Sequence, residues 1–144
     1  MKVYNLTKAH IQRINDVSKT TLKVSLLDLR NLKDNPFLLI VQSTIENSIK
    51  VSIYPLKKDK IIKLIFSTFT FSNEIFDRIT DVLQNFQVIH TSGVLLIEKQ
   101  VYYECYLNLS LDEAKSMGLN GSLNKIKNIF TQIKIEEIEL IKQN

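Results

Sequence analysis

The residue types that carry nucleophilic or metal chemistry are few and isolated in this sequence of 144 residues. Cys105 is the only thiol, and its place in an alternating apolar run predicts a buried side chain that behaves as a small hydrophobe. His10 and His90 lie far apart in the sequence, and neither has a partner at metal-ligand spacing. The three glycines fit no phosphate-binding loop. The sequence therefore predicts no enzyme activity, no metal site and no cofactor.

Three acidic residues, Glu74, Asp77 and Asp81, recur along one side of an amphipathic stretch. Acid–base catalysis needs carboxylates in a cleft, whereas this spacing is typical of a solvated helix face. The tyrosines at 102 and 106 resemble the base-stacking surface of an RNA-binding sheet. The glycines of that signature are missing, and Glu104 between the tyrosines repels phosphate. Single-stranded nucleic-acid binding is therefore kept only as a weak third alternative.

The composition is that of a folded chain, with 44% apolar and 24% charged residues. The net charge of +4 is mild and indicates a mixed, solvated surface. No apolar run approaches the roughly 18 residues of a membrane span, and we expect neither a membrane partner nor a secretory signal. Because a single cysteine forms no internal disulfide, we expect a cytoplasmic protein.

Residues 1–56 are predicted to form an N-terminal segment of one helix followed by three strands. Apolar residues at helical spacing after Thr7 predict the helix, while alternating or continuous apolar runs predict the strands. The predicted elements cover residues 7–19, 22–29, 37–44 and 50–54. Pro55 and the lysines after it mark the end of this segment.

Residues 57–144 are predicted to form the main domain, with the order strand, helix, strand, strand, helix, strand. Ser72 is the predicted N-cap of the first helix, and Ser122 is the predicted N-cap of the second. The predicted strands cover residues 60–71, 87–97, 101–109 and 132–141, and the predicted first helix covers residues 73–86. This order predicts an α+β fold, a ferredoxin-like βαββαβ antiparallel sheet with two helices on one face, preceded by the N-terminal helix and three-stranded segment.

The alternation of side chains along residues 101–109 assigns them to the two faces of the sheet. Tyr103, Cys105 and Leu107 are predicted to lie under the helices. On the other face lie Tyr102, Glu104 and Tyr106, the predicted interface residues. Because residues 60–71 are apolar on both faces, we expect this second face to be covered, either by the N-terminal segment or by a second subunit.

Residues 72–83, which read SNEIFDRITDVL, resemble the first helix of an ACT domain, with its Arg-Ile-x-x-x-Leu core at Arg78, Ile79 and Leu83. The resemblance continues through FQVIH at 86–90 and the apolar, aromatic residues 102–109. It implies a small regulatory domain that pairs edge to edge in a dimer and holds an amino acid between a loop and a neighbouring strand. The implied ligand-binding residues are Thr70, Ser72, Asn73 and Glu74 in the loop and His90, Thr91 and Ser92 on the strand. Ser72 and Glu74 also fit ordinary helix capping.

Three functions follow from these observations. The first is a non-enzymatic, ACT-like regulatory module that senses an amino acid or a similar small ligand at the interface of a homodimer. The second is a structural or protein-interaction module that binds a protein partner, or a second copy of itself, without a small ligand. The third is the weak single-stranded nucleic-acid binder.

Overall fold

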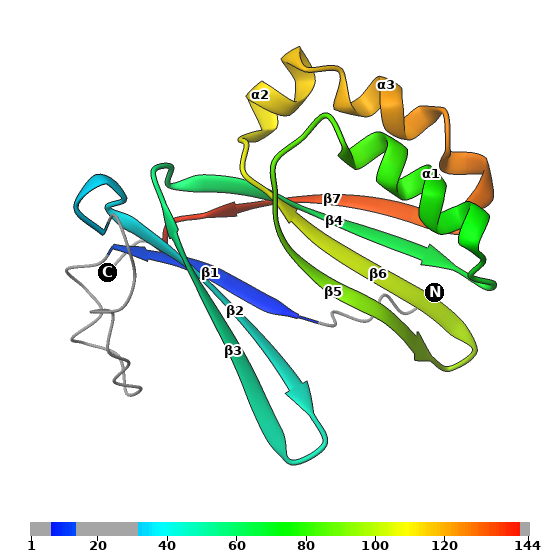
Figure 1. The fold of residues 1–144 in the computed structure, drawn as a ribbon, viewed down its shortest axis with the longest axis horizontal. Helices are drawn as coiled ribbons and strands as arrows, with labels where there is room; N and C mark the ends of the chain where they lie inside the picture. Colours follow the sequence, from blue (N-terminus) through cyan, green and yellow to red (C-terminus); the bar gives the residue numbers. More distant parts are fainter. Residues whose placement is uncertain (1–6, 14–31, 142–144) are drawn as a thin grey trace. The chain divides into compact units, whose positions relative to one another are not determined.

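The computed structural model describes residues 7–13 and 32–141, and the chain divides into two compact units (Figure 1). Unit 1 comprises Met1–Lys60 together with Ile138–Asn144, and unit 2 comprises Ile61–Glu137. The end of the chain thus belongs to the same unit as its beginning, which differs from the predicted division into residues 1–56 and 57–144. The predicted strand over residues 22–29 lies outside the described residues.

Unit 1 contains an antiparallel sheet with the strand order β1-β2-β3. Its strands are β1 (Lys8–Arg13), β2 (Phe37–Ile45) and β3 (Ser48–Leu56), and a short 3-10 helix, η2 (Leu32–Asp34), precedes β2. The strands predicted over residues 37–44 and 50–54 are confirmed as β2 and β3. Ile11 on β1 lies opposite Leu39 on β2, and both side chains are fully buried. The returning chain end adds a hydrogen bond from the amide of Ile141 to the carbonyl of Ile11.

The predicted helix over residues 7–19 is wrong at its start, because residues 8–13 form β1. The apolar spacing that indicated a helix is also compatible with alternation in a short strand. What decides between them is pairing: six residues of β1 lie in register with β2, from Lys8 opposite Gln42 to Arg13 opposite Phe37. Such long-range pairing overrides local propensity. Residues 14–19 of the prediction lie outside the described part of the chain.

Unit 2 is built on a four-stranded sheet with the order β5-β6-β4-β7. The strands are β4 (Lys60–Thr68), β5 (Val88–Ile97), β6 (Gln100–Leu107) and β7 (Gln132–Glu139). The helices are α1 (Asn73–Leu83), α2 (Leu111–Ser116), α3 (Leu119–Asn124) and the 3-10 helix η3 (Lys127–Ile129). β6 pairs antiparallel with both β4 and β5. In Figure 1 the three α-helices lie over the same face of this sheet.

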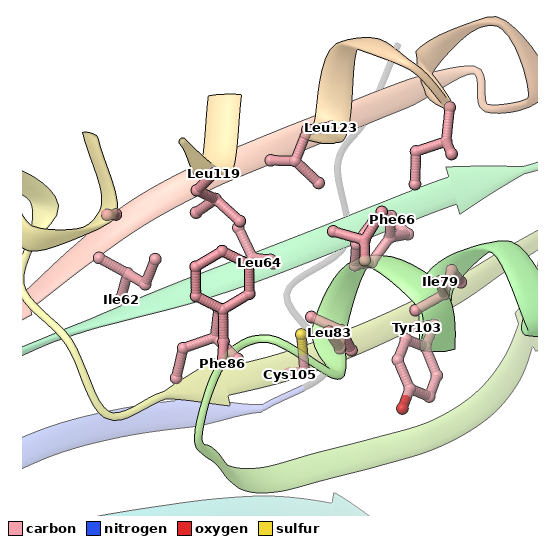
Figure 2. Close-up of a cluster of buried hydrophobic side chains, with 14 of the residues drawn as sticks. Ile62, Leu64, Phe66, Ile79, Leu83, Phe86, Tyr103, Cys105, Leu119 and Leu123 are labelled. Atoms are coloured by element: carbon pink, nitrogen blue, oxygen red, sulfur yellow. The ribbon is translucent and has the colours of Figure 1, made fainter. Parts of the chain in front are cut away.

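The core of unit 2 lies between that sheet and its helices, and Figure 2 shows the side chains that fill it. α1 contributes its buried stripe, and β4 and β6 contribute every second residue, as alternation along a strand requires. The prediction that Tyr103, Cys105 and Leu107 lie under the helices is therefore confirmed. The cluster is closed by aromatic contacts, with the rings of Phe66 and Phe130 centred 5.1 Å apart. Cores of this kind lose about 2–5 kcal/mol when one large aliphatic side chain is cut back to alanine.

The second helical region is broken where the sequence predicted a loop and a single helix beginning after Ser122. α2 begins at a capping box, in which Ser110 and Glu113 each bond to the other's backbone amide. Gly118 then takes a left-handed conformation with φ of 74°, and the six-residue α3 starts directly after it. Residues 118–121, predicted as a loop, thus lie largely within α3.

The predicted fold class is corrected by these observations. About half of the described residues are in strands and a quarter in helices, and the strands form two separate antiparallel sheets of three and four strands with three α-helices. Neither the N-terminal helix nor a single second helix is present among the described residues, so the chain is not the predicted ferredoxin-like βαββαβ fold with an appended helix and three-stranded segment. The prediction was wrong because it inferred the arrangement of strands and helices in the whole chain from the local spacing of apolar residues.

Candidate functional site

The loop residues of the predicted ligand site have structural roles at the start of α1. Thr70, Ser72, Asn73 and Glu74 are all exposed. The Ser72 hydroxyl accepts a hydrogen bond from the Ile75 amide at 3.3 Å, which makes Ser72 the N-cap of the helix, as predicted. The Glu74 carboxylate lies 3.8 Å from Arg78, one turn along the same helix. These contacts are those of an ordinary helix start.

The strand residues of the predicted ligand site are engaged elsewhere. The His90 ring meets the Tyr106 ring edge-on at 5.9 Å. Thr91 shares a side-chain hydrogen bond with Tyr103, and burial, acting against that bond, raises the pKa of Tyr103. Ser92 donates to the Gly93 carbonyl at 2.8 Å and accepts from the Glu104 amide at 3.0 Å.

His90 and the loop residues of the predicted ligand site lie at different levels of the sheet. Tyr106 on β6 pairs with both His90 and Lys63, so His90 lies level with Lys63 on β4. The loop begins only after Thr68, five residues further along β4. At about 3.4 Å per residue this separation is about 17 Å of strand. Ser92 lies nearer to the loop, because its hydroxyl accepts from the amide of Glu104, which pairs with Ile65, three residues before Thr68. The ligand site made of these seven residues stays a prediction.

The predicted interface residues Tyr102, Glu104 and Tyr106 are buried, with exposed fractions of 1%, 0% and 0%. They lie on the sheet face opposite the helices, where Tyr102 donates a hydrogen bond to the Gln100 side chain at 3.0 Å. These fractions agree with the expectation that this face is covered, and the role of the three residues in an interface stays a prediction.

A buried ion pair lies on the same sheet face. The Lys63 ammonium is 3.2 Å from the Glu104 carboxylate, and the two side chains are 2% and 0% exposed. The ammonium also lies 5.6 Å from the centre of the Tyr106 ring, within range of a cation–π contact. Burial of two opposite charges side by side is stable only when they compensate each other.

Sequence reasoning missed Lys63, although the signal was present. It interrupts the apolar run Ile61-Ile62-Lys63-Leu64-Ile65, where a lysine without a counter-charge would be costly. Alternation places Lys63 on the same face as Ile61 and Ile65. Glu104, in the middle of another apolar strand, is the matching acid. Two isolated opposite charges in two central strands predict a buried pair.

Other reactive groups have little chemistry available to them. Burial raises the pKa of the Cys105 thiol to about 12, so its thiolate is scarce at neutral pH. Burial also lowers the pKa of His10. Among the described residues, no three His, Cys, Asp or Glu side chains gather as a metal site. No helix in this part of the chain is long and apolar enough to cross a membrane.

The exposed feature that stands out is the outer strand β5. It is an edge of the four-stranded sheet and carries no charged residue between Val88 and Ile97. Val94, Leu95 and Leu96 are 45%, 43% and 72% exposed. Val94 and Leu96 pair with Tyr103 and Val101 and so face the helices, whereas Leu95 faces the other way. The exposed Phe76 of α1 meets the Tyr103 ring edge-on and extends the patch on the helix side.

We call Val94, Leu95, Leu96 and Phe76 the edge patch. An edge strand with apolar side chains on both faces is a template for another strand, unless charge or proline blocks it. Neither occurs in β5. The edge patch can therefore bind an extended segment through main-chain hydrogen bonds and bury side chains on both faces of the sheet.

No protein-family model matches the chain, and no curated protein sequence matches it either. The resemblance of residues 60–141 to an ACT domain therefore stays a prediction.

Proposed function

We propose that the protein is a non-enzymatic interaction module that forms a homodimer by pairing its edge strand β5 with β5 of a second copy. The observation that carries the proposal is the edge patch, an uncharged apolar sequence on an outer strand. Isolated exposed apolar residues need no explanation, but a contiguous group on a sheet edge is typical of a binding surface.

A second copy is the favoured partner because the sequence of the edge is self-complementary. A two-fold axis through Leu95, perpendicular to the sheet, makes the paired strands antiparallel and keeps the helices of both copies on the same side. Leu95 then lies opposite the partner's Leu95, and Val94 lies opposite the partner's Leu96. The nearest charges, Glu98 and Lys99, lie in the turn after β5, outside the paired stretch. No like charges oppose each other in this register.

Two earlier predictions bear on this proposal. Sensing of an amino acid or a similar small ligand at a dimer interface stays a prediction. We also propose the cytoplasm as the compartment, since the single cysteine is a buried free thiol and the chain has no disulfide to maintain.

Sedimentation equilibrium of the full chain tests the proposal. Wild-type protein is expected to be a dimer at micromolar concentration, and Leu96→Lys is expected to be a monomer with an unchanged circular dichroism spectrum. Leu96 is mostly exposed, so the substitution introduces charge at the edge without disturbing the core. The matched control is Ile49→Lys in unit 1, because Ile49 is 65% exposed and lies on β3.

The register has its own test. In the variant Leu95→Cys, the new thiols of the two copies lie opposite each other, within the Cα separation that a disulfide allows. Mild oxidation should give a covalent dimer from this variant and none from Ile49→Cys. A wild-type monomer at high concentration, or equal effects of Leu96→Lys and Ile49→Lys, would show that β5 is not the interface.

A further inference from the structure

A cleft in unit 2, away from the edge patch, has the volume of a small-molecule site. It has a volume of about 490 Å³ and is formed by residues of α3, η3 and the first half of β7 (orange to red in Figure 1). Small-molecule sites typically measure about 300–1,000 Å³. All of its lining residues belong to unit 2.

The polar lining of the cleft is almost entirely uncharged. It consists of four carboxamides, one hydroxyl and one ammonium group, from Asn120, Asn124, Asn128, Gln132, Thr131 and Lys127. No carboxylate lines the cleft, although acids are common on the neighbouring part of β7. Within the described part of the chain, no side-chain hydrogen bond or ion pair engages any of these six groups. Their donors and acceptors are available to a ligand.

The floor of the cleft is apolar and firmly held. Leu123 and Phe130 are buried members of the core cluster, and Ile133 and Ile135 pack against it. Ile133 and Ile135 are partly exposed, so they provide the apolar surface on which a flat ring can lie beside the carboxamides. A carboxamide donates and accepts hydrogen bonds at once, which suits the edge of a nucleobase or the hydroxyls of a sugar. Lys127, the only charge, suits one anionic group such as phosphate.

We propose that this cleft binds a phosphate monoester of a polar ring compound, of the size of a mononucleotide. The phosphate lies at Lys127, the ring lies on Ile133 and Ile135, and the polar edge of the ring meets the asparagines. Sugar phosphates share this chemistry with mononucleotides, and the experiment separates the two. The positive net charge of the chain, +4, favours the approach of such an anion.

The test is calorimetric titration of the full chain with the four ribonucleoside monophosphates, ribose 5-phosphate, adenosine and inorganic phosphate. A phosphate monoester is expected to bind at least tenfold more tightly than adenosine or inorganic phosphate alone. Preference for a nucleotide over ribose 5-phosphate identifies the ring as a base, and the reverse identifies it as a sugar. Amide chemical-shift changes should centre on residues 120–135.

Two variants assign the binding to the cleft. Lys127→Gln removes the charge and should weaken binding at least tenfold, whereas Lys125→Gln, two residues away and outside the lining, should leave it unchanged. Asn124→Asp places a carboxylate beside the phosphate and should abolish binding, with Asn47→Asp in unit 1 as its control. All four residues are exposed, so the fold is expected to persist.

The proposal is overturned if no phosphate monoester binds at millimolar concentration, if adenosine binds as tightly as its monophosphate, or if Lys127→Gln and Lys125→Gln behave alike. It is also independent of the dimer: Leu96→Lys should bind the same ligand with the same affinity. Failure of one proposal thus leaves the other intact.

Discussion

Replacement of the buried lysine on β4 by Lys63→Met is expected to destabilise the protein strongly. The Glu104 carboxylate would then lose the ammonium group 3.2 Å away while staying fully buried. Methionine keeps the length and apolar contacts of the lysine stem and adds no charge. The effect of the substitution is therefore mainly the loss of compensation for the carboxylate.

The magnitude follows from the geometry. At 3.2 Å and an effective dielectric constant of about 20, the attraction between the two charges is about 5 kcal/mol. Desolvation of both ions opposes this attraction, so the intact pair adds little net stability. Removing one partner leaves that cost uncompensated, and we expect a loss of about 3–5 kcal/mol in the free energy of unfolding. The double variant Lys63→Met/Glu104→Met should lose less than either single variant, because no charge stays buried.

Urea unfolding followed by far-ultraviolet circular dichroism measures all three variants and completes a double-mutant cycle. The control is Arg78→Met, which breaks the exposed Glu74–Arg78 pair in the same unit. That pair should contribute no more than about 0.5 kcal/mol. If Lys63→Met costs no more than the control, or if the double variant loses the sum of the two single losses, the two charges do not compensate each other.

Two further predictions follow from perturbed ionisation. Burial raises the pKa of the Cys105 thiol to about 12 from the usual 9.0. Cys105 should therefore react with a thiol reagent at pH 8 only as fast as the protein unfolds. A reaction rate in the native protein like that of a free thiol would contradict its placement in the core. Burial lowers the pKa of His10 below its usual 6.5, so the folded state binds this proton less readily than the unfolded state. Stability from neutral His10 should therefore be complete above pH 6.5 and be lost as the pH falls through that value. The urea midpoint of wild-type protein should drop relative to His10→Gln between pH 7.5 and pH 5.5, and parallel curves would exclude this role.

The parts of the fold that the sequence predicted are those fixed by local rules. α1 was predicted with its N-cap Ser72 and its stripe of buried residues, because capping and helical periodicity both act within a few residues. β2 was predicted from its continuous apolar run and β3 from its alternation.

The parts that the sequence did not predict depend on distant partners. β1 is a strand because it pairs with β2, which lies more than twenty residues later in the sequence. Residues 7–13 carry no local signal that predicts this pairing. The apolar residues that predicted the second helix after Ser122 are Leu123, Ile126, Ile129 and Phe130. Three of them are buried, whereas Ile129 is 40% exposed, and the backbone that carries them divides between α3 and a 3-10 helix. For three of these four residues, burial could be predicted from the apolar side chain itself. Whether a helix is continuous depends on how the whole helical layer packs on the sheet.

The candidate site was the least predictable part. The ligand-binding residues came from a family resemblance, and register shows that His90 and the loop residues lie at different levels of the sheet. The edge patch could not be predicted, because the apolar run at 94–97 reads the same in an inner strand as in an outer one. Only the strand order makes it an exposed edge. The cleft likewise joins residues whose common feature appears only when α3 and β7 are both in place.

The irregularity at Gly93 limits how far strand addition can spread. With φ of 75° at Gly93 and the Ser92 hydroxyl bonded to the Glu104 amide, the ladder is interrupted in the middle of β5. Such interruptions twist the strand, so its outer N–H and C=O groups no longer form a continuous row with which another strand can pair. Only residues 94–97, beyond the interruption, are straight enough to pair with another strand. In the two-fold homodimer this stretch is occupied on both copies at once. The same glycine that bends the strand thus favours a closed pair over the open-ended stacking by which amyloid grows.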